Sequence, residues 1–290
     1  MKNLIFTSAG QREFRDKNNN PIEGTAIESW NDGDREFDIV VYCYDESLTG
    51  MGDCDVWVQR KGTKYQNFYH YAINNSKELE QYDYVWVVDD DMFMSTDDIN
   101  KMFMMMEDYN IDLGQPSMDN EGMHYIHFLI NDPDYTLRYT NYIECSAPIF
   151  SKPALQKILP TFNETITGFG WDALISDMIL EEDNVAVFDN IKAYHAPSMS
   201  TINKVLHRAE HSVEGNKLLK KYNKEDILQK RDVLSGILLD GKKKVFVNGN
   251  RGSFTYRPFA KWRIRIKIML GDVVTWKPEI MHYPKYQWRR

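Results

Sequence analysis

The feature that most restricts the fold of this chain is an apolar run that ends in three consecutive aspartates. Residues 84–88 (YVWVV) have the composition of a strand that is covered on both faces. Asp89, Asp90 and Asp91 follow at once. Adjacent carboxylates ~4 Å apart repel each other by roughly 4 kcal/mol at an effective dielectric constant near 20. The three aspartates therefore lie either in open water or beside a cation.

The segments on either side alternate between strand and helix patterns. The strand-like runs are residues 3–10, 36–45 and 84–88, and the helical patterns cover 65–72, 96–106 and 171–178. Ser95 or Thr96 is suited to cap the second of these helices, and residues 141–159 indicate a strand and then a helix capped by Ser151. Residues 185–197 suggest two short strands that lead to His195. This alternation predicts an α/β fold with a mostly parallel sheet flanked by helices. In such sheets ligands bind beyond the carboxyl ends of the strands, which favours a cation for the aspartates.

Charge is divided unevenly along the 290 residues, which together carry a net charge of −8. Residues 1–200 hold 14 Lys and Arg against 35 Asp and Glu, whereas residues 201–290 hold 21 against 8. The pattern predicts two regions, an acidic body over 1–200 and a basic C-terminal region over 201–290 that is helical and then β. A basic region suits an anionic partner, although it could also pack on the acidic body.

Several protein classes are disfavoured by the sequence. No apolar run approaches the ~20 residues of a membrane span, and the apolar run at residues 4–6 is too short for a signal peptide, so a cytoplasmic protein is expected, in the host cytoplasm if it is viral. Cys43, Cys54 and Cys145 fit no disulfide framework or zinc spacing.

Alternation along a strand places Asp89 and Asp91 on one side and Asp90 on the other. Two carboxylates that project together suit Mg²⁺ or Mn²⁺ and leave coordination positions for a diphosphate. The alternative is an acidic turn that precedes a helix N-terminus, where Asp is favoured in any case.

Six segments of the chain resemble a known family in sequence and order. They are KNLIFTSAG, FDIVVYCYD, KGTKYQNF, WVVDDDM, IECSAPIFS and GFGWD, within residues 2–200. The chain resembles a plant and bacterial family of largely uncharacterised glycosyltransferases with the GT-A fold, a Rossmann-like fold in which a D-x-D motif binds a metal and a nucleotide-sugar. It departs from that family in having DDD where D-E-D is more usual, and in a polar insertion at residues 11–28.

The resemblance implies that residues 1–200 form the catalytic domain, which binds the donor and the metal, and it implies roles for particular residues. Asp89 and Asp91 would hold Mn²⁺ or Mg²⁺ on the diphosphate of the donor, a UDP-sugar being favoured, with His195 as third ligand and Asp90 near the ribose or sugar. Asp172 would be the catalytic base of an inverting transfer. From spacing alone, Asp172 could equally be a helix N-cap and His195 a structural histidine.

The remaining residues implied by the resemblance lie around this centre. Ala9, Gly10, Tyr44 and Asp45 would cradle the nucleoside, and Lys64 would reach a phosphate. Glu144 is expected to touch the sugar or the acceptor, and Trp171 is a further candidate for the acceptor.

The acceptor is suggested by the C-terminal region, where Arg and Lys alternate with aromatic residues. Arg263, Arg265 and Lys267 lie on one face of a period-2 pattern, and cations interleaved with aromatic rings are typical of nucleic-acid surfaces. This favours a hydroxymethylated base in DNA as the acceptor, by analogy with DNA-modifying enzymes of phages. A glycan or lipid-linked sugar is the alternative acceptor. Two further classes stay open, a phosphoryl-transfer enzyme and a non-catalytic nucleic-acid-binding protein.

Overall fold

A computed structural model of the chain describes residues 1–16, 18, 20–50, 52–124, 126–197, 208–229 and 231–246. The strands are β1 (Asn3–Ala9), β2 (Phe37–Cys43), β3 (Val56–Gln59), β4 (Tyr84–Asp89), β5 (Met92–Phe93), β6 (Leu113–Met118), β7 (Tyr135–Thr140), β8 (Ile149–Ser151), β9 (Val185–His195), β10 (Val233–Leu238) and β11 (Lys243–Val245). The helices are α1 (Ala26–Ser29), α2 (Lys64–Asn74), α3 (Ser76–Leu79), α4 (Thr96–Asp108), α5 (Lys152–Ile158), α6 (Trp171–Ile179) and α8 (Arg208–Lys221), with 3-10 turns at His127–Leu129, Leu159–Glu164 and Ile227–Gln229.

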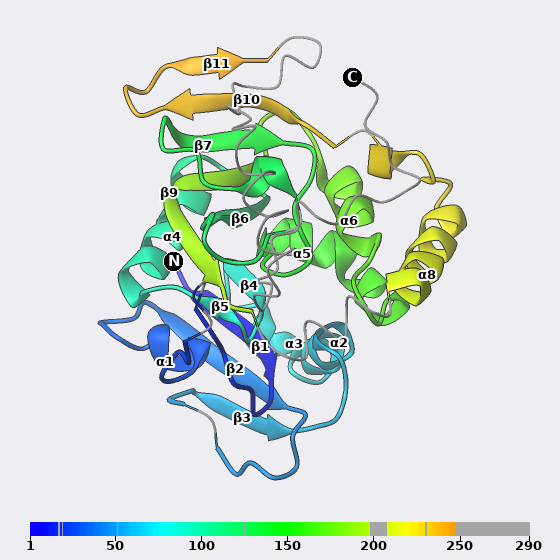
Figure 1. Ribbon diagram of the computed structural model, residues 1–290. Coiled ribbons are helices and arrows are strands. Elements are labelled where there is room, and N and C mark those ends of the chain that lie inside the picture. Colours follow the sequence, from blue (N-terminus) through cyan, green and yellow to red (C-terminus); the bar gives the residue numbers. More distant parts are fainter. Residues whose placement is uncertain are drawn as a thin grey trace, which may run out of the picture.

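One sheet runs through the described part of the chain in the order β11-β10-β7-β9-β6-β8-β4-β1-β2-β3, and β5 pairs with β9 beside it (Figure 1). Strands β3, β2, β1 and β4 are parallel neighbours, as are β6 and β9. The other pairings, made by β5, β7, β8, β10 and β11, are antiparallel. The prediction of an α/β sheet with parallel strands flanked by helices is therefore confirmed.

Helices cover both faces of the sheet, because successive side chains of a strand point to opposite faces. Along β1, Leu4 and Phe6 pack toward α2, α5 and α6, whereas Ile5 packs toward α1 and α4. In Figure 1 these two groups of helices lie on opposite sides of the strands. Both faces of the central strands are thus buried, which explains their nearly continuous apolar sequences.

Side chains at the helix N-termini fix where the helices begin. Ser95 accepts a hydrogen bond from Asp98 N at 3.2 Å and Ser151 accepts one from Ala154 N at 3.3 Å, so both predicted caps are confirmed. Thr63 caps α2 in a capping box with Gln66, which the sequence analysis did not identify.

Some segments differ from the sequence-based predictions. Residues 142–148 form a loop, and the strand predicted there is reduced to β8. Residues 185–195 form one strand, not two short ones. Strand β6 was missed because Gly114 and Pro116 interrupt its apolar run, and the register of β6 against β9 shifts just after Pro116.

The first part of the C-terminal region belongs to the same sheet as the body, since β10 pairs with β7 and β11 pairs with β10. Helix α8 packs on the loop that precedes α6. Glu214 of α8 accepts hydrogen bonds from the Thr165 hydroxyl at 2.9 Å and from the Ile166 amide at 2.6 Å.

Gly215 allows α8 to approach this loop closely, and we expect Gly215→Ala to destabilise the protein. A Cβ at Gly215 would stand 2.6 Å from the carbonyl oxygen of Phe169, so the helix would have to move. The clash should outweigh the gain of ~1 kcal/mol in helix propensity and leave a net loss of roughly 1–2 kcal/mol in urea denaturation. Asn216→Ala, at the exposed neighbouring position, is the matched control and should be neutral or stabilising. Equal stability of the two variants would contradict the close packing of α8.

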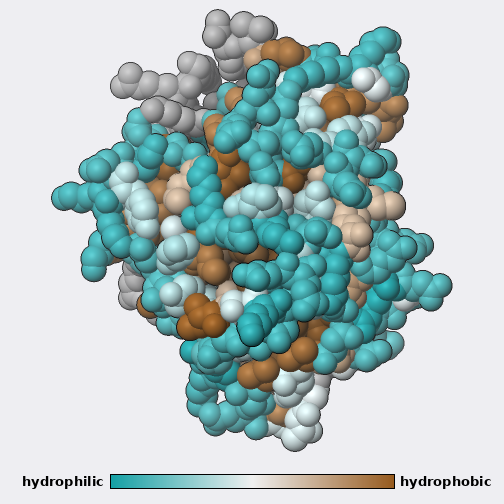
Figure 2. Space-filling model, turned by 180° about the vertical axis from the view of Figure 1, so that it is seen from behind, coloured by the Kyte–Doolittle hydropathy of each residue, from teal (hydrophilic) through white to brown (hydrophobic). Residues whose placement is uncertain are grey.

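The surface is largely polar. Figure 2 shows hydrophilic residues over most of the face turned away in Figure 1, with hydrophobic residues in separate groups between them. Among the described residues, none of the helices has both the length and the apolar character needed to cross a membrane.

Candidate functional site

The carboxyl ends of β1, β2 and β4 meet at one edge of the sheet. Ser8 lies opposite Asp89 in the pairing of β1 with β4. The Tyr44 amide donates a hydrogen bond to the Ala9 carbonyl at 3.0 Å, which brings the end of β2 to the same edge. The predicted nucleoside-site residues and the aspartates are therefore neighbours, at the edge where ligands bind in open α/β sheets.

The residues expected to cradle the nucleoside differ in how exposed their side chains are to solvent. Ala9 is fully buried, so its side chain belongs to the core. Gly10 lies against the Tyr44 ring, and a Cβ there would stand 2.2 Å from Cε2 of that ring. Asp45 is partly exposed, and hydrogen bonds from the Ser47 hydroxyl and amide hold the pKa of its carboxyl below the usual value.

Lys64 neutralises the first aspartate. Its ammonium lies 2.9 Å from Asp89 Oδ1 and donates hydrogen bonds to the carbonyl oxygens of Cys145 at 2.7 Å and Ser146 at 3.0 Å. These contacts use all three N–H groups of the lysine. A phosphate could reach Lys64 only by displacing one of these partners, so the structure gives Lys64 primarily the role of holding Asp89 and the 145–146 loop together.

Arg12 neutralises the other two aspartates. Its Nη1 lies 3.1 Å from Asp90 Oδ1 and 3.2 Å from Asp91 Oδ2, and its Nε donates a hydrogen bond to the Tyr44 hydroxyl at 2.9 Å. The expectation that Asp90 points away from Asp91 is wrong, because β4 ends at Asp89 and the turn that follows lets both carboxylates reach one guanidinium. Burial raises the pKa of Asp90 to about 6, although Arg12 acts against this rise. Arg12 is not predictable from the sequence, because it lies in the polar insertion, which has no periodic pattern.

His195 is adjacent to Asp91. The pairing of β5 with β9 places Met92 opposite His195, and His195 Nε2 lies 3.4 Å from Asp91 Oδ1. Burial acts to lower the pKa of His195, but the Asp91 carboxylate outweighs it and the pKa is raised overall. The structure thus brings together two of the three predicted metal ligands.

The aspartates and His195 fit a divalent ion in part. Two donor atoms in adjacent positions of an octahedral ion with bonds of ~2.1 Å lie ~3 Å apart, close to the observed spacing of Asp91 and His195. Asp89, the third expected ligand, faces Lys64 instead. Across the described ranges, no three or more His, Cys, Asp or Glu side chains are grouped as a metal site. Asp91 and His195 would therefore hold the ion, and Asp89 would join them only on leaving Lys64.

Arg12 acts as the cation of this cluster, and we expect Arg12→Ala to destabilise the protein. Removing one partner of a buried ion pair lowers the free energy of unfolding by roughly 3–5 kcal/mol. Because an added ion that binds only the folded state stabilises it, millimolar Mn²⁺ should restore part of this loss in urea denaturation. Arg15→Ala is the control, since the Arg15 side chain is more exposed, and should change stability by less than ~1 kcal/mol. An unchanged stability of Arg12→Ala, or a loss that Mn²⁺ leaves untouched, would contradict this role.

Asp172, the residue expected to act as the base, lies at the second position of α6. The helix cap is Gly170, so the alternative interpretation of Asp172 as an N-cap is wrong. Asp172 Oδ2 accepts a hydrogen bond from the Tyr142 hydroxyl at 2.6 Å, and Oδ1 accepts one from the Ala173 amide at 2.8 Å. Burial raises the pKa of Asp172, and the Tyr142 hydrogen bond acts in the opposite direction.

Trp171 lies in the core and is fully buried. It packs against Phe162 with ring centroids 4.7 Å apart and donates a hydrogen bond to the Thr161 hydroxyl at 2.8 Å. The structure therefore gives Trp171 a packing role, in place of the acceptor contact expected from the sequence.

A residue of the C-terminal region lies beside Tyr142, the hydrogen-bond partner of Asp172. The Arg231 guanidinium lies 4.7 Å from the centre of the Tyr142 ring, and its charge acts on both Asp172 and Glu144. Arg231 is not predictable from the sequence, because an isolated arginine outside any motif carries no signal. Arg263, Arg265 and Lys267, the other residues expected to contact an acceptor, lie outside the described residues.

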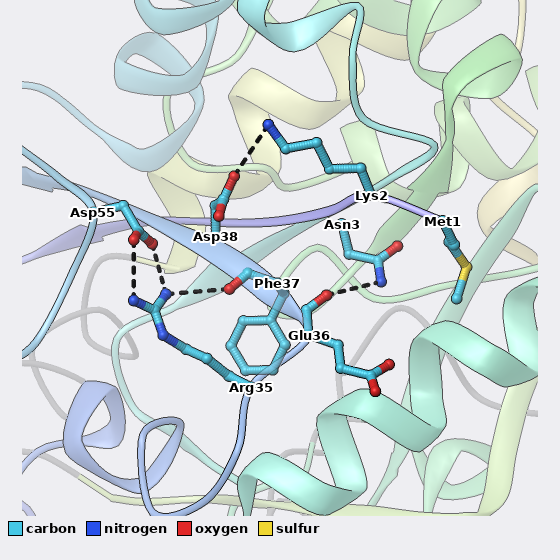
Figure 3. Close-up of a pocket in the computed structure, with 8 residues that line it drawn as sticks. All are labelled: Met1, Lys2, Asn3, Arg35, Glu36, Phe37, Asp38 and Asp55. Atoms are coloured by element: carbon cyan, nitrogen blue, oxygen red, sulfur yellow. Dashed lines mark hydrogen bonds and ion pairs between the residues drawn. The ribbon is translucent and has the colours of Figure 1, made fainter.

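A separate pocket of about 330 Å³ lies at the opposite end of the strands. Figure 3 shows its lining, which includes Asn3 and Phe37, the first residues of β1 and β2, and the ion pair of Arg35 with Asp55. The pocket lies at the amino ends of β1 and β2, whereas the aspartates lie at the carboxyl end of the neighbouring parallel strand β4. The pocket is therefore not part of the candidate site.

Comparisons with known proteins give distant structural likenesses. No family model matches the sequence, and no curated protein matches it. A197 from STIV is 13% identical over 86% of this chain and 95% of its own, with a TM-score of 0.38. Residues 1–349 of S. aureus TarS, also solved in complex with UDP, are 14% identical over 79% of this chain and 70% of their own, with a TM-score of 0.44. A 4-diphosphocytidyl-2C-methyl-D-erythritol synthase from Anaerococcus prevotii is 13% identical over 75% of this chain and 95% of its own, with a TM-score of 0.40. At such identities and scores, the function has to be inferred from the residues of the chain itself.

Proposed function

We propose that this protein is a metal-dependent glycosyltransferase that moves a sugar from a nucleotide-sugar, with UDP-sugars favoured, to a hydroxyl group. The observation that carries the proposal is the meeting of Asp91 and His195 at the carboxyl edge of the parallel strands, beside Asp89 and Asp90. These four titratable side chains are buried or half-buried at one edge of the sheet. Such clusters are typical of functional sites, because burying ionisable groups does not by itself stabilise a fold.

The residues divide into a donor side and an acceptor side. On the donor side, Asp91 and His195 would hold Mn²⁺ or Mg²⁺, while the Gly10 backbone and Tyr44 would contact the nucleoside. When bound, the ion would act as a Lewis acid that offsets charge on the departing diphosphate. Arg12 has N–H groups beyond those that Asp90, Asp91 and Tyr44 accept, and these could meet the diphosphate.

On the acceptor side, Asp172 would take the proton of the attacking hydroxyl, which is general-base catalysis. Its raised pKa makes the carboxylate a better proton acceptor than a solvent-exposed aspartate. Tyr142 holds the carboxylate in place through its 2.6 Å hydrogen bond. This assignment corresponds to a transfer that inverts the anomeric carbon.

For the acceptor we propose a hydroxymethylated base in DNA, contacted by the C-terminal region over 201–290. The support is the composition of residues 251–290, which interleave ten Lys and Arg with aromatic residues. A gel-shift titration on such DNA should show affinity that falls steeply with salt. Affinity that does not depend on salt would favour a glycan or lipid-linked sugar instead.

Donor binding is tested by a thermal-shift panel of UDP- and GDP-hexoses, each with and without Mn²⁺. A ligand present at 100 times its Kd stabilises the folded protein by ~2.7 kcal/mol, which raises the Tm measurably. We expect one sugar nucleotide to raise the Tm only when Mn²⁺ is present. A protein that responds to none of them is not a glycosyltransferase of this kind.

A further inference from the structure

We infer that Glu144 and Ser146 form a subsite for hydroxyl groups of the sugar that the nucleotide carries. This inference rests on the proposed function and deepens it, since it concerns which part of the donor each residue recognises. The two residues lie in the loop between β7 and β8, next to the aspartates.

The loop that carries them is fixed against the acid edge. The Ser146 carbonyl accepts hydrogen bonds from the Asp89 amide at 2.8 Å and from the Lys64 ammonium at 3.0 Å. The Glu144 amide donates to Gln115 Oε1 at 2.7 Å. These contacts fix the backbone of the loop that carries both side chains, and a backbone fixed before the ligand arrives favours recognition.

In the described structure, each of the two side chains has one buried polar atom without a hydrogen-bond partner. Glu144 is 5% exposed and Ser146 is 4% exposed. Within the part of the chain that the structure describes, neither Glu144 Oε2 nor Ser146 Oγ has a hydrogen-bond partner. An unsatisfied buried polar group costs roughly 1–3 kcal/mol, and native proteins leave few of them. Two such groups within three residues of each other indicate a polar ligand.

Charge narrows the nature of that ligand. The charges of His195, Asp172 and Asp89 all act on Glu144, so its carboxyl lies near groups of both the donor side and the acceptor side. A phosphate would be repelled by these carboxylates, whereas a neutral hydroxyl can donate to Glu144 and exchange hydrogen bonds with Ser146. Burial raises the pKa of Glu144 to about 7, so the group can also serve in its neutral form as a hydrogen-bond donor. A hexose is a polyol of this kind, because each of its hydroxyls can both donate and accept a hydrogen bond.

The inference is tested by comparing two ligands that differ only in the sugar. Isothermal titration with Mn²⁺ would measure the Kd of UDP and of the UDP-hexose that the wild type prefers. We expect Glu144→Gln and Ser146→Ala to bind UDP as the wild type does, and to bind the UDP-hexose about tenfold more weakly or worse, which is the loss of one or two hydrogen bonds. Glu80→Gln and Ser76→Ala, on and beside α3, are the matched controls and should leave both values unchanged.

The possible outcomes separate this inference from the proposed function. If the wild type binds no nucleotide-sugar, the proposed function fails. The proposed function stands and the sugar subsite is refuted in two cases in which the wild type binds a nucleotide-sugar. In the first, both variants lose affinity for UDP and for the UDP-hexose equally. In the second, both variants keep the wild-type affinity for each ligand. A Glu144→Gln protein that binds the UDP-hexose normally but cannot transfer the sugar would overturn recognition and make Glu144 the base. Circular dichroism and the Tm of each variant show whether it is folded, and both substitutions preserve shape well enough that folding is expected.

Discussion

Asp91→Asn is expected to abolish Mn²⁺-dependent donor binding and to lower turnover ~100-fold or more, a loss of ~3 kcal/mol in transition-state stabilisation. The substitution keeps the shape of the side chain but removes the charge that faces both His195 and Arg12. Asparagine is a weaker ligand than a carboxylate for a hard divalent ion. Titration of Mn²⁺ by calorimetry, followed by an assay of sugar transfer, measures both effects.

The fold of Asp91→Asn should survive, because Asp90 still pairs with Arg12. Asp97→Asn, at an exposed position in the first turn of α4, is the matched control and should keep Mn²⁺ binding and turnover. If Asp91→Asn binds Mn²⁺ and the sugar nucleotide with wild-type affinity, the assignment of Asp91 as a ligand has to be abandoned.

Asp172→Asn is expected to keep donor binding and to lower transfer by roughly 10²–10⁴-fold, the range that general-base catalysis contributes. Asparagine can still accept a hydrogen bond from the Ala173 amide, so α6 should begin as before, but it cannot take a proton from an acceptor. Single-turnover assays at saturating donor, together with the Kd of the donor, separate the two effects. Lost donor binding in this variant would show that Asp172 is not the base.

Tyr142→Phe gives the same hypothesis a second test through pH. The Tyr142 hydroxyl stabilises the charged form of Asp172 and so lowers its pKa, and removing the hydroxyl should raise the pKa of Asp172 further. A base works only when it is deprotonated, so the acid limb of the rate profile should move to higher pH and activity should be recovered as the pH rises. If the acid limb of the variant's rate profile stays at its wild-type pH, Tyr142 and Asp172 do not take part in the proton transfer.

The sequence predicts an element best where a local pattern alone determines it. Apolar runs such as residues 37–43 and 84–88 became central strands because both of their faces are covered, and Ser95 and Ser151 became caps because each precedes a helical pattern. Strands β6 and β7 were not recognised. Pro116 in β6 and Arg138 in β7 contradict the strand pattern locally, and the structure tolerates them because of contacts far along the chain. Arg138, for instance, is buried against Asp189 at 2.7 Å.

The candidate site was only partly predictable for the same reason. The family resemblance implies Asp89, Asp91 and His195 as metal ligands, and of these Asp91 and His195 lie side by side whereas Asp89 faces Lys64. Arg12, Tyr142 and Arg231 were missed, since each matters only through partners that the fold brings to it from distant parts of the chain. Local sequence patterns therefore predict elements and motifs. The counter-ions of a buried cluster depend on tertiary contacts, which local patterns do not contain.

The continuous sheet has a practical consequence for anyone who wishes to dissect this protein. Strand β10 pairs with β7, so a fragment that stops near residue 200 would turn an interior strand into an open edge. Open edges invite pairing between molecules and hence aggregation. A truncation meant to remove the basic tail while preserving solubility should therefore retain the chain through β11, and its comparison with full-length protein would then report on the tail alone.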